Sequence, residues 1–301
     1  MERRARSAVV LGGHGQSPQR HFFWRLHCAI RMPAEENWTL RVERMEPGRT
    51  HVSTLVANRG ACVLLGLHRF RAPKQEHADF WKDAATKFRD HPAVLFDLFN
   101  EPHGMSWEVW CDGGFVSENE KPADEDAFLS AEEKAKAAPG FQFIGKQALI
   151  NAVRSTGVRN IVVTDGLDWA YDLSGVASGF ELKDVGGNGI ICSTHIYPWK
   201  RGWQEKVLVV AAKHPILVGE VAADIKKMDF IPANAQEDPF TRVPEMRGFM
   251  QKYKLHWTGF SFHPAATPVM FSGWDCTLTP FWGAFAKDAL AGENFEMRKM
   301  R

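Results

Sequence analysis

Two glutamates stand directly after short apolar runs, which is where a buried strand would end. Glu101 follows the run Ala93–Phe99 and Asn100, and Glu220 follows the run Pro215–Gly219. If both runs are strands of one parallel sheet, the two carboxyl groups face one cleft at its carboxyl edge. A protonated and an ionised carboxyl group across a cleft can break a glycosidic bond, because the leaving oxygen needs a proton while the sugar carbon develops positive charge.

Other polar and imidazole side chains occupy the same kind of position. The residues that follow or end further apolar runs are Arg31, His68, Asn100, His195, Tyr197 and His263. Functional residues of a parallel barrel collect at the carboxyl ends of its strands. We therefore expect these side chains to line the same cleft as the two glutamates.

Eight short apolar runs, rich in β-branched residues, alternate with helical patterns along the chain. The runs are 8–11, 28–32, 61–67, 93–99, 160–164, 189–194, 215–219 and 257–262. Their continuous apolar character is typical of parallel strands that are covered on both faces, whereas sandwich strands alternate. The pattern predicts an α/β fold, a (β/α)8 TIM barrel, which takes about 250 residues as one domain. We expect residues 1–301 to form a single catalytic domain.

Two segments depart from a regular barrel. About sixteen residues separate the first two runs, so we expect an abbreviated first βα unit. After the fourth run, a long loop insertion at about 103–140 contains Trp107 and Trp110, and a connection of that length is usually functional or mobile. Helical spacing of apolar residues predicts helices over 80–88 and 141–153.

The composition favours a neutral partner. The formal net charge is +1 and the basic residues form no stripe, so we expect neither nucleic acid nor a membrane as a partner. The chain contains 11 Trp, and planar rings can hold the apolar faces of sugars. Trp199 and Trp203, after the sixth run, are equally suited to be platforms for distal sugars or packing in the barrel wall. The five Cys are widely spaced, which argues against structural zinc.

Several of these segments, taken in order, resemble glycoside hydrolase family 5 of the cellulase superfamily. The resemblance rests on Asn100–Pro102, His195–Tyr197 and Val218–Glu220, preceded by Arg31 and His68, and it extends from about residue 28 to residue 290. It implies that Glu101 is the acid/base and Glu220 the nucleophile. It also implies a retaining mechanism, with carboxyl groups about 5 to 5.5 Å apart.

The resemblance implies further roles at the cleft. Asn100 would hold the sugar 2-hydroxyl, and Tyr197 would hydrogen-bond the nucleophile. Arg31 would lie beside the nucleophile and keep it ionised, because a guanidinium lowers the pKa of a nearby carboxylate. His68 and His195 would line the subsite where the bond breaks.

The chain also departs from this family. Gly66 stands where members commonly have Asp before Leu-His, which loosens the support around His68. A Trp is common near Phe260, so the ring that stacks on the reactive sugar is Phe260, Trp274 or Trp169.

By this resemblance we expect a retaining endo-β-1,4-glucanase that acts on polysaccharide or oligosaccharide chains of cellulose or mixed β-glucan. A β-mannanase or another β-glycosidase, exo-acting if the long loop closes the cleft, is the alternative within the family. A catalytically silent carbohydrate-binding barrel is the alternative of a different class, although the intact pair of glutamates argues against it.

We expect no cofactor and no metal. His68 and His195 could be metal ligands, but no His-x-His pair ends the first run and no lone Asp follows the eighth. We expect a secreted monomer, although no signal peptide is visible: residues 1–15 contain one short apolar stretch, 8–11.

Overall fold

The computed structural model describes most of the chain. The described residues are 8–12, 25–30, 62–89, 91–117, 140–226, 231, 233–264 and 267–301, and for the first two of these ranges only the backbone is described. Arg31 lies outside them, so the role implied for it stays a prediction.

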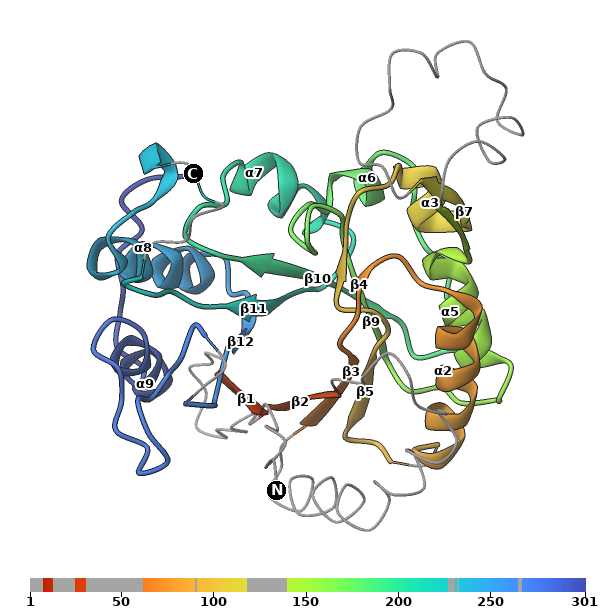
Figure 1. Ribbon diagram of the computed structural model, residues 1–301, viewed down its shortest axis with the longest axis horizontal. Coiled ribbons are helices and arrows are strands. Elements are labelled where there is room, and N and C mark those ends of the chain that lie inside the picture. The colour runs from red at the N-terminus through yellow and green to blue at the C-terminus, as the bar shows by residue number, and fades with distance from the viewer. Residues whose placement is uncertain are drawn as a thin grey trace.

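In this part of the chain, eight strands close into a barrel (Figure 1). They are β1 Ala8–Gly12, β2 Arg25–Ile30, β3 Cys62–Leu67, β5 Val94–Asp97, β9 Val162–Asp165, β10 Ile190–Ile196, β11 Ile216–Val221 and β12 His256–Gly259. Their order around the barrel is β1-β12-β11-β10-β9-β5-β3-β2. Each of the eight apolar runs supplies one strand, so the predicted (β/α)8 barrel is confirmed.

The irregularity expected in the first unit takes the form of a reversed strand. The seven strands from β2 to β12 pair in parallel, whereas β1 is antiparallel to both of its neighbours, with Ala8 opposite Cys28 and Leu11 opposite Thr258. Antiparallel strands need no crossover helix, while parallel strands need a dozen or more connecting residues. The reversed direction therefore agrees with the short spacing between the first two runs.

Two apolar layers hold the barrel together. Inside it, Leu64, Leu95, Val163 and Leu217 from four strands form one buried cluster. Outside it, a larger cluster packs the strands against the surrounding helices. These helices are α2 Gln75–Lys87, α5 Gly145–Arg154, α6 Ser174–Ala177, α7 Trp203–Lys206, α8 Pro239–Lys252 and α9 Gly283–Ala291, with 3-10 turns at Leu208–Val210 and Ala233–Ala235.

One of the two predicted helices is confirmed, and the predicted start of the other is wrong. Helix α2 buries Phe80, Trp81 and Ala84 as their spacing predicted. The second helix, α5, begins only at Gly145, so the prediction of helix from 141 was wrong. Residues 141–143 lie in a strand instead, in which Phe141 is exposed and Phe143 is buried.

The structure describes both ends of the long segment after the fourth barrel strand. It contains helix α3 Trp107–Asp112 and an antiparallel hairpin of β7 Gly114–Ser117 with β8 Gly140–Phe143. The Trp110 ring is buried and donates a hydrogen bond of 2.9 Å to the Asp165 carbonyl. The Trp107 ring packs against Trp110 at 5.0 Å. These two rings therefore attach the segment to the barrel wall.

Helix α8 buries charged side chains as well as apolar ones. Arg242, Glu245 and Arg247 on this helix are all buried. The Arg247 guanidinium lies 3.5 Å from the centre of the Trp257 ring and 4.6 Å from that of Trp282. Burial lowers the pKa of Arg247 to about 9. None of the described helices is both long enough and apolar enough to cross a membrane.

Trp81 provides a test of the packing of α2. Its side chain is fully buried and its indole N–H donates to the Leu98 carbonyl at 2.8 Å. Trp81→Ala should lower the free energy of unfolding by about 3 to 5 kcal/mol, because it leaves a large cavity and an unpaired carbonyl. Urea denaturation measures this loss. The control Trp274→Ala, at a side chain that is 76% exposed, should change it by less than about 0.5 kcal/mol, and equal losses would contradict the packing described here.

Candidate active site

The two glutamates of the sequence pattern meet at the carboxyl end of the barrel, with an imidazole between them. Glu101 lies in β6 Glu101–Pro102, just after β5, and Glu220 lies near the end of β11. His195 Nδ1 lies 3.0 Å from Glu101 Oε1 and 3.5 Å from Glu220 Oε2. Carboxylate oxygens of the two glutamates lie within 4.8 Å of each other. The structure thus brings these three predicted residues into one site.

An irregularity in strand register sets the position of Glu220. Thr194 pairs with Val218, but the next residue, His195, pairs with Glu220, so Gly219 is an extra residue in β11. Because strand side chains alternate, one extra residue changes which face the following side chain occupies. A Cβ atom at position 219 would clash with the Ser193 hydroxyl and lie 3.2 Å from His195 Nε2, so glycine leaves room for both side chains.

Tyr197 makes the contact expected of it. Its hydroxyl donates a hydrogen bond of 2.6 Å to Glu220 Oε2. Burial and the negative charge of Glu220 raise the pKa of the Tyr197 hydroxyl well above its ordinary value. The phenol therefore keeps its proton and stabilises the carboxylate as a donor.

His195 is a buried cation. Burial by itself would lower the pKa of its imidazole. The carboxylate of Glu220, the hydrogen-bonded carboxylate of Glu101 and the carboxylate of Asp165 outweigh burial, and together they raise this pKa to about 10. At neutral pH the ring is an imidazolium whose Nδ1–H faces both glutamates.

A second layer of charge lies beneath this imidazolium. Asp165 Oδ1 lies 3.5 Å from His195 Nε2, and the carboxyl group of Asp97 is close enough to affect the pKa of Asp165. Burial raises the pKa of both aspartates, and the charge of Asp97 raises that of Asp165 further. Lys146 from α5 is fully buried, donates to the Phe99 carbonyl at 2.8 Å, and has its pKa lowered by burial to about 8.

These three buried residues were not among the predicted site residues. Asp165 directly follows the fifth apolar run, so the criterion that identified Glu101 would also have identified it. Asp97 lies within an apolar run and Lys146 lies within a helix, and neither position carries a sequence signal of its own. Asp97 pairs in register with Gly66, so a carboxylate is present beside the position where the family commonly has Asp.

The remaining predicted residues lie around this centre at different depths. Asn100 is buried, and neither atom of its side-chain amide has a hydrogen-bond partner among the described residues. Such an amide, adjacent to Glu101, is available to a ligand. His68 follows β3 and meets the edge of Phe70, with 5.2 Å between ring centres.

Of the three rings considered for stacking, Trp169 belongs to a residue that contacts the strand of Glu101. It is 46% exposed, its backbone N–H donates to the Pro102 carbonyl at 3.2 Å, and its ring stacks on His103 with 3.5 Å between centres. Trp274 meets the edge of His263 at 5.0 Å. Phe260 is half-buried and packs against the outer core cluster.

The same centre includes a set of possible metal ligands. Donor atoms of Glu101, His195 and Glu220 lie within 4.8 Å of one another. A metal would need the lone pair of a neutral imidazole, whereas His195 Nδ1 is already hydrogen-bonded to Glu101. The arrangement fits proton transfer better than metal binding.

Fold and site together define a barrel hydrolase with two facing glutamates. The model of the family described as Cellulase (glycosyl hydrolase family 5) matches residues 50–266, more than half of the chain. The chain belongs to this family of glycoside hydrolases, as the sequence motifs predicted.

Solved structures show the same fold. The β-glucanase SdGluc5_26A from Saccharophagus degradans, in complex with cellotetraose, is 19% identical with a TM-score of 0.62, over 96% of this chain and 94% of that chain. The catalytic domain of endoglucanase Cel5A (E5) from Thermobifida fusca is 15% identical with a TM-score of 0.60, over 89% of this chain and 80% of that chain. At these identities the likeness concerns the fold.

The charge beneath His195 can be tested by titration. Asp165→Asn removes one of the carboxylates that raise the pKa of His195, so this pKa should fall by about one unit or more. The imidazole nitrogen shifts in NMR spectra report the protonation, and the signal is assigned by its absence in His195→Asn. The control Asp184→Asn removes a carboxylate that pairs with Arg154 before the start of β10, and it should leave the titration unchanged. An unchanged titration in Asp165→Asn would show that Asp165 does not act on the ring.

Proposed function

We propose that the protein is a retaining endo-β-1,4-glucanase that acts on cellulose or mixed-linkage β-glucan. The observation that supports this most is the pair Glu101 and Glu220, whose carboxylate oxygens lie within 4.8 Å. Retaining enzymes have carboxyl groups about 5 to 5.5 Å apart, whereas inverting enzymes need about 6.5 to 9.5 Å to admit a water between them. The short separation favours direct attack by one carboxylate.

In the first step, Glu220 is the nucleophile. The Tyr197 hydroxyl and the His195 imidazolium both face its carboxylate, so the negative charge is stabilised until the sugar arrives. The carboxylate attacks the anomeric carbon and forms a glycosyl ester, while Glu101 gives its proton to the leaving oxygen. The unpaired amide of Asn100 is placed to hold the hydroxyl beside the reacting carbon.

In the second step, Glu101 is the base, and His195 stabilises its ionised form. Once Glu220 is an ester it carries no charge, and the imidazolium faces one fewer carboxylate on that side. The Nδ1–H, 3.0 Å from Glu101 Oε1, then stabilises the ionised form of Glu101. This form accepts a proton from the attacking water, which releases the sugar and restores Glu220.

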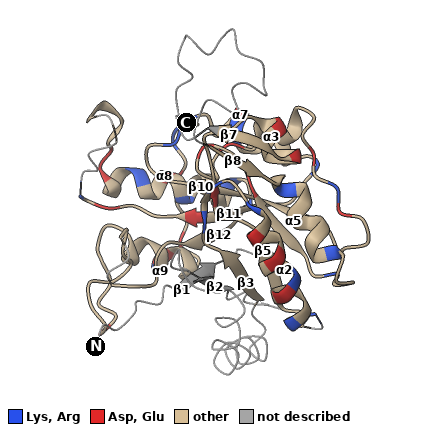
Figure 2. Cartoon of the chain, turned by 45° about the vertical axis from the view of Figure 1, so that its right-hand side comes forward, with Lys and Arg blue, Asp and Glu red and all other residues tan. Residues whose placement is uncertain are grey.

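The substrate proposal rests on charge and on the neighbouring structures. Along the described chain, acidic and basic residues are interspersed, without a basic stripe (Figure 2). A neutral glycan suits such a surface better than nucleic acid does. The S. degradans β-glucanase was solved with cellotetraose, a β-linked glucose chain, which supports β-glucan over other glycans. We also propose that the protein is a secreted monomer.

Substitutions of the two glutamates test the roles separately. Glu220→Ala should reduce the release of reducing ends from carboxymethyl cellulose and barley β-glucan by more than about a thousandfold, because no nucleophile remains. Glu101→Ala should do the same on these polymers but retain activity on an aryl cellobioside with a very acidic leaving group, which needs no proton. A control, Glu293→Ala at an exposed loop position, should match the wild type.

Other outcomes have definite meanings. Near-normal activity of both variants on polymers would contradict the assigned site. Release of reducing ends from mannan or xylan alone would show that one of these glycans, and not β-glucan, is the substrate. A folded protein that binds sugar but shows no turnover on any of these glycans would be a carbohydrate-binding barrel.

A further inference from the structure

The segment that follows β9 makes a turn with an unusual backbone. Asp168, Trp169 and Ala170 are consecutive residues other than glycine, and their φ angles are 54°, 60° and 62°. Residues with a side chain seldom adopt this left-handed conformation, and then usually singly, because their Cβ atom approaches the following carbonyl oxygen. Leu167 and Asp172 pair across the base of the turn, with backbone hydrogen bonds of 2.9 and 2.8 Å. A conformation of this kind persists only where the surrounding contacts hold it.

The backbone of this turn bonds to both sides of the catalytic centre. The Trp169 N–H donates to the carbonyl of Pro102, the residue after Glu101, at 3.2 Å. The Ala170 carbonyl accepts a hydrogen bond from the His195 N–H, also at 3.2 Å. Two neighbouring residues of the turn therefore fix the strand of Glu101 relative to the strand of His195. A change in the turn would alter the 3.0 Å contact between these two side chains.

A lysine from the segment after β10 binds this turn. Lys200 Nζ donates to the Asp168 carbonyl at 2.8 Å and lies 3.1 Å from the Asp168 carboxylate. The same ammonium lies 5.1 Å from the centre of the Tyr171 ring. Hydrogen bonds from a charged donor are stronger than neutral ones. The lysine side chain is 11% exposed, so water competes little for these contacts.

The backbone of Lys200 is itself held by two arginines. Its carbonyl accepts hydrogen bonds of 3.2 Å from both Arg201 Nη1 and Arg242 Nη2. Arg242 is fully buried, and Arg201 is paired with Glu237 in the loop after β11. The ammonium of Lys200 therefore extends to the turn from a fixed backbone.

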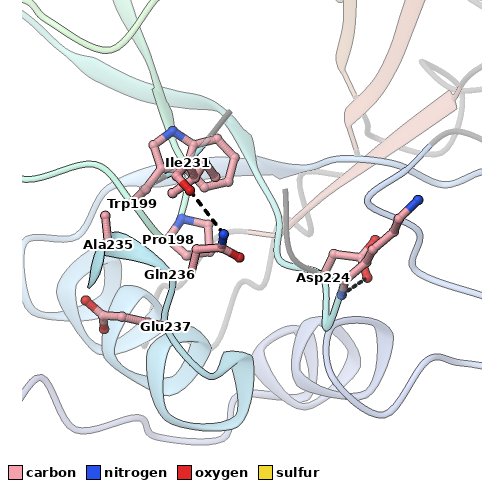
Figure 3. Close-up of a pocket in the computed structure, with 8 residues that line it drawn as sticks. Pro198, Trp199, Asp224, Ile231, Ala235, Gln236 and Glu237 are labelled. Atoms are coloured by element: carbon pink, nitrogen blue, oxygen red, sulfur yellow. Dashed lines mark hydrogen bonds between the residues drawn. The ribbon is translucent and has the colours of Figure 1, made fainter. Parts of the chain in front are cut away.

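Contacts with the loop after β11 hold the same segment from another side. The side chains that line the small pocket between this loop and the segment include Pro198, Trp199, Gln236 and Glu237 (Figure 3). Trp203, four residues after Trp199, is fully buried. Of the two rings that the sequence left open, Trp203 thus packs within the barrel wall, and Trp199 lines this pocket.

A second lysine lies beside the turn but makes different contacts. Lys206 Nζ lies 3.0 Å from the Asp172 carboxylate and 3.9 Å from that of Asp168, and its side chain is 38% exposed. These contacts are with side-chain carboxylates, whereas Lys200 binds the backbone of the turn. The two lysines carry the same charge near the same turn, so Lys206 is a matched control for Lys200.

We propose that Lys200 is a positioning residue: by binding the backbone of the Asp168–Ala170 turn, it holds Glu101 where the leaving oxygen can take its proton. The inference rests on the proposed glucanase function and adds a residue that acts through the turn and not on the sugar. Without the lysine, the turn relaxes toward ordinary backbone angles and loses its bonds to Pro102 and His195.

Two substrates that differ only in the leaving group test this role. Lys200→Met removes the ammonium and should lower kcat/KM on phenyl cellobioside by about tenfold, because Glu101 is displaced from the leaving oxygen. The same variant should stay within about twofold of the wild type on dinitrophenyl cellobioside, whose leaving group needs no proton. Lys206→Met should match the wild type on both. Lys200→Gln replaces Lys200→Met if that variant does not fold.

Two kinetic results would overturn the proposal. An equal loss on both substrates in the Lys200 variant would show that the lysine does not act through Glu101. Unchanged kcat/KM on phenyl cellobioside would show that the turn needs no lysine to hold it.

A glycine in the turn tests how Lys200 acts. Glycine adopts a positive φ without steric cost, so Asp168→Gly leaves less strain for the lysine to hold. In the Asp168→Gly background, Lys200→Met should therefore cost less than about twofold on phenyl cellobioside, against about tenfold in the wild-type background. A tenfold loss in both backgrounds would contradict action through the turn.

Hydrogen exchange separates this inference from the proposed function, because it needs no substrate. The amides of Trp169 and His195 should exchange at least about tenfold faster in Lys200→Met than in the wild type or Lys206→Met, since the turn no longer holds their bonds. Unchanged exchange overturns the proposal. Faster exchange in Lys200→Met, when the wild type hydrolyses no glucan, contradicts the proposed function alone.

Discussion

The buried imidazolium of His195 between Glu101 and Glu220 is the interaction on which the site depends. Two carboxylates this close would repel each other, and each would be costly to bury alone. The cation stabilises the Glu220 carboxylate, and Glu101 whenever Glu101 is ionised, and Asp165 lies 3.5 Å from its other ring nitrogen. The partners therefore stabilise one another's charge, and removal of any one leaves an uncompensated buried charge.

The charged groups of the site come from separate strands and a helix. The imidazole comes from β10, the carboxylates come from β6, β9 and β11, and the buried ammonium of Lys146 comes from α5. Because parallel strands end together, residues far apart in the chain meet without a dedicated loop. Lys146 also bonds to the Phe99 carbonyl, two residues before Glu101, so the position of α5 is linked to that of the acid/base.

The sequence predicted the parts of this arrangement that follow from strand ends. Continuous apolar runs mark buried parallel strands, and a polar residue after such a run marks the carboxyl edge, which is why Glu101, His195 and Glu220 could be found. Asp97 could not be found this way, because it lies inside an apolar run and not after one. The sequence does not indicate which groups surround it in the structure. The direction of β1 was equally hidden, since an apolar run has the same pattern in either orientation. Trp199 and Trp203 have similar sequence surroundings, and only burial distinguishes them.

The ion pairs that join α8 and Glu237 to Arg301 have a consequence for how the protein responds to temperature and salt. Apolar packing, which holds α2, α5 and α8, weakens on cooling. The desolvation penalty of ion pairs falls as temperature rises, so the group of Arg242, Glu245, Glu237 and Arg301 holds better in a warm solution. Salt weakens the partly exposed ion pairs of this group by screening. It has much less effect on the buried charges of the catalytic centre. Ionic strength and temperature therefore affect these ion pairs more than they affect the charges of the catalytic centre.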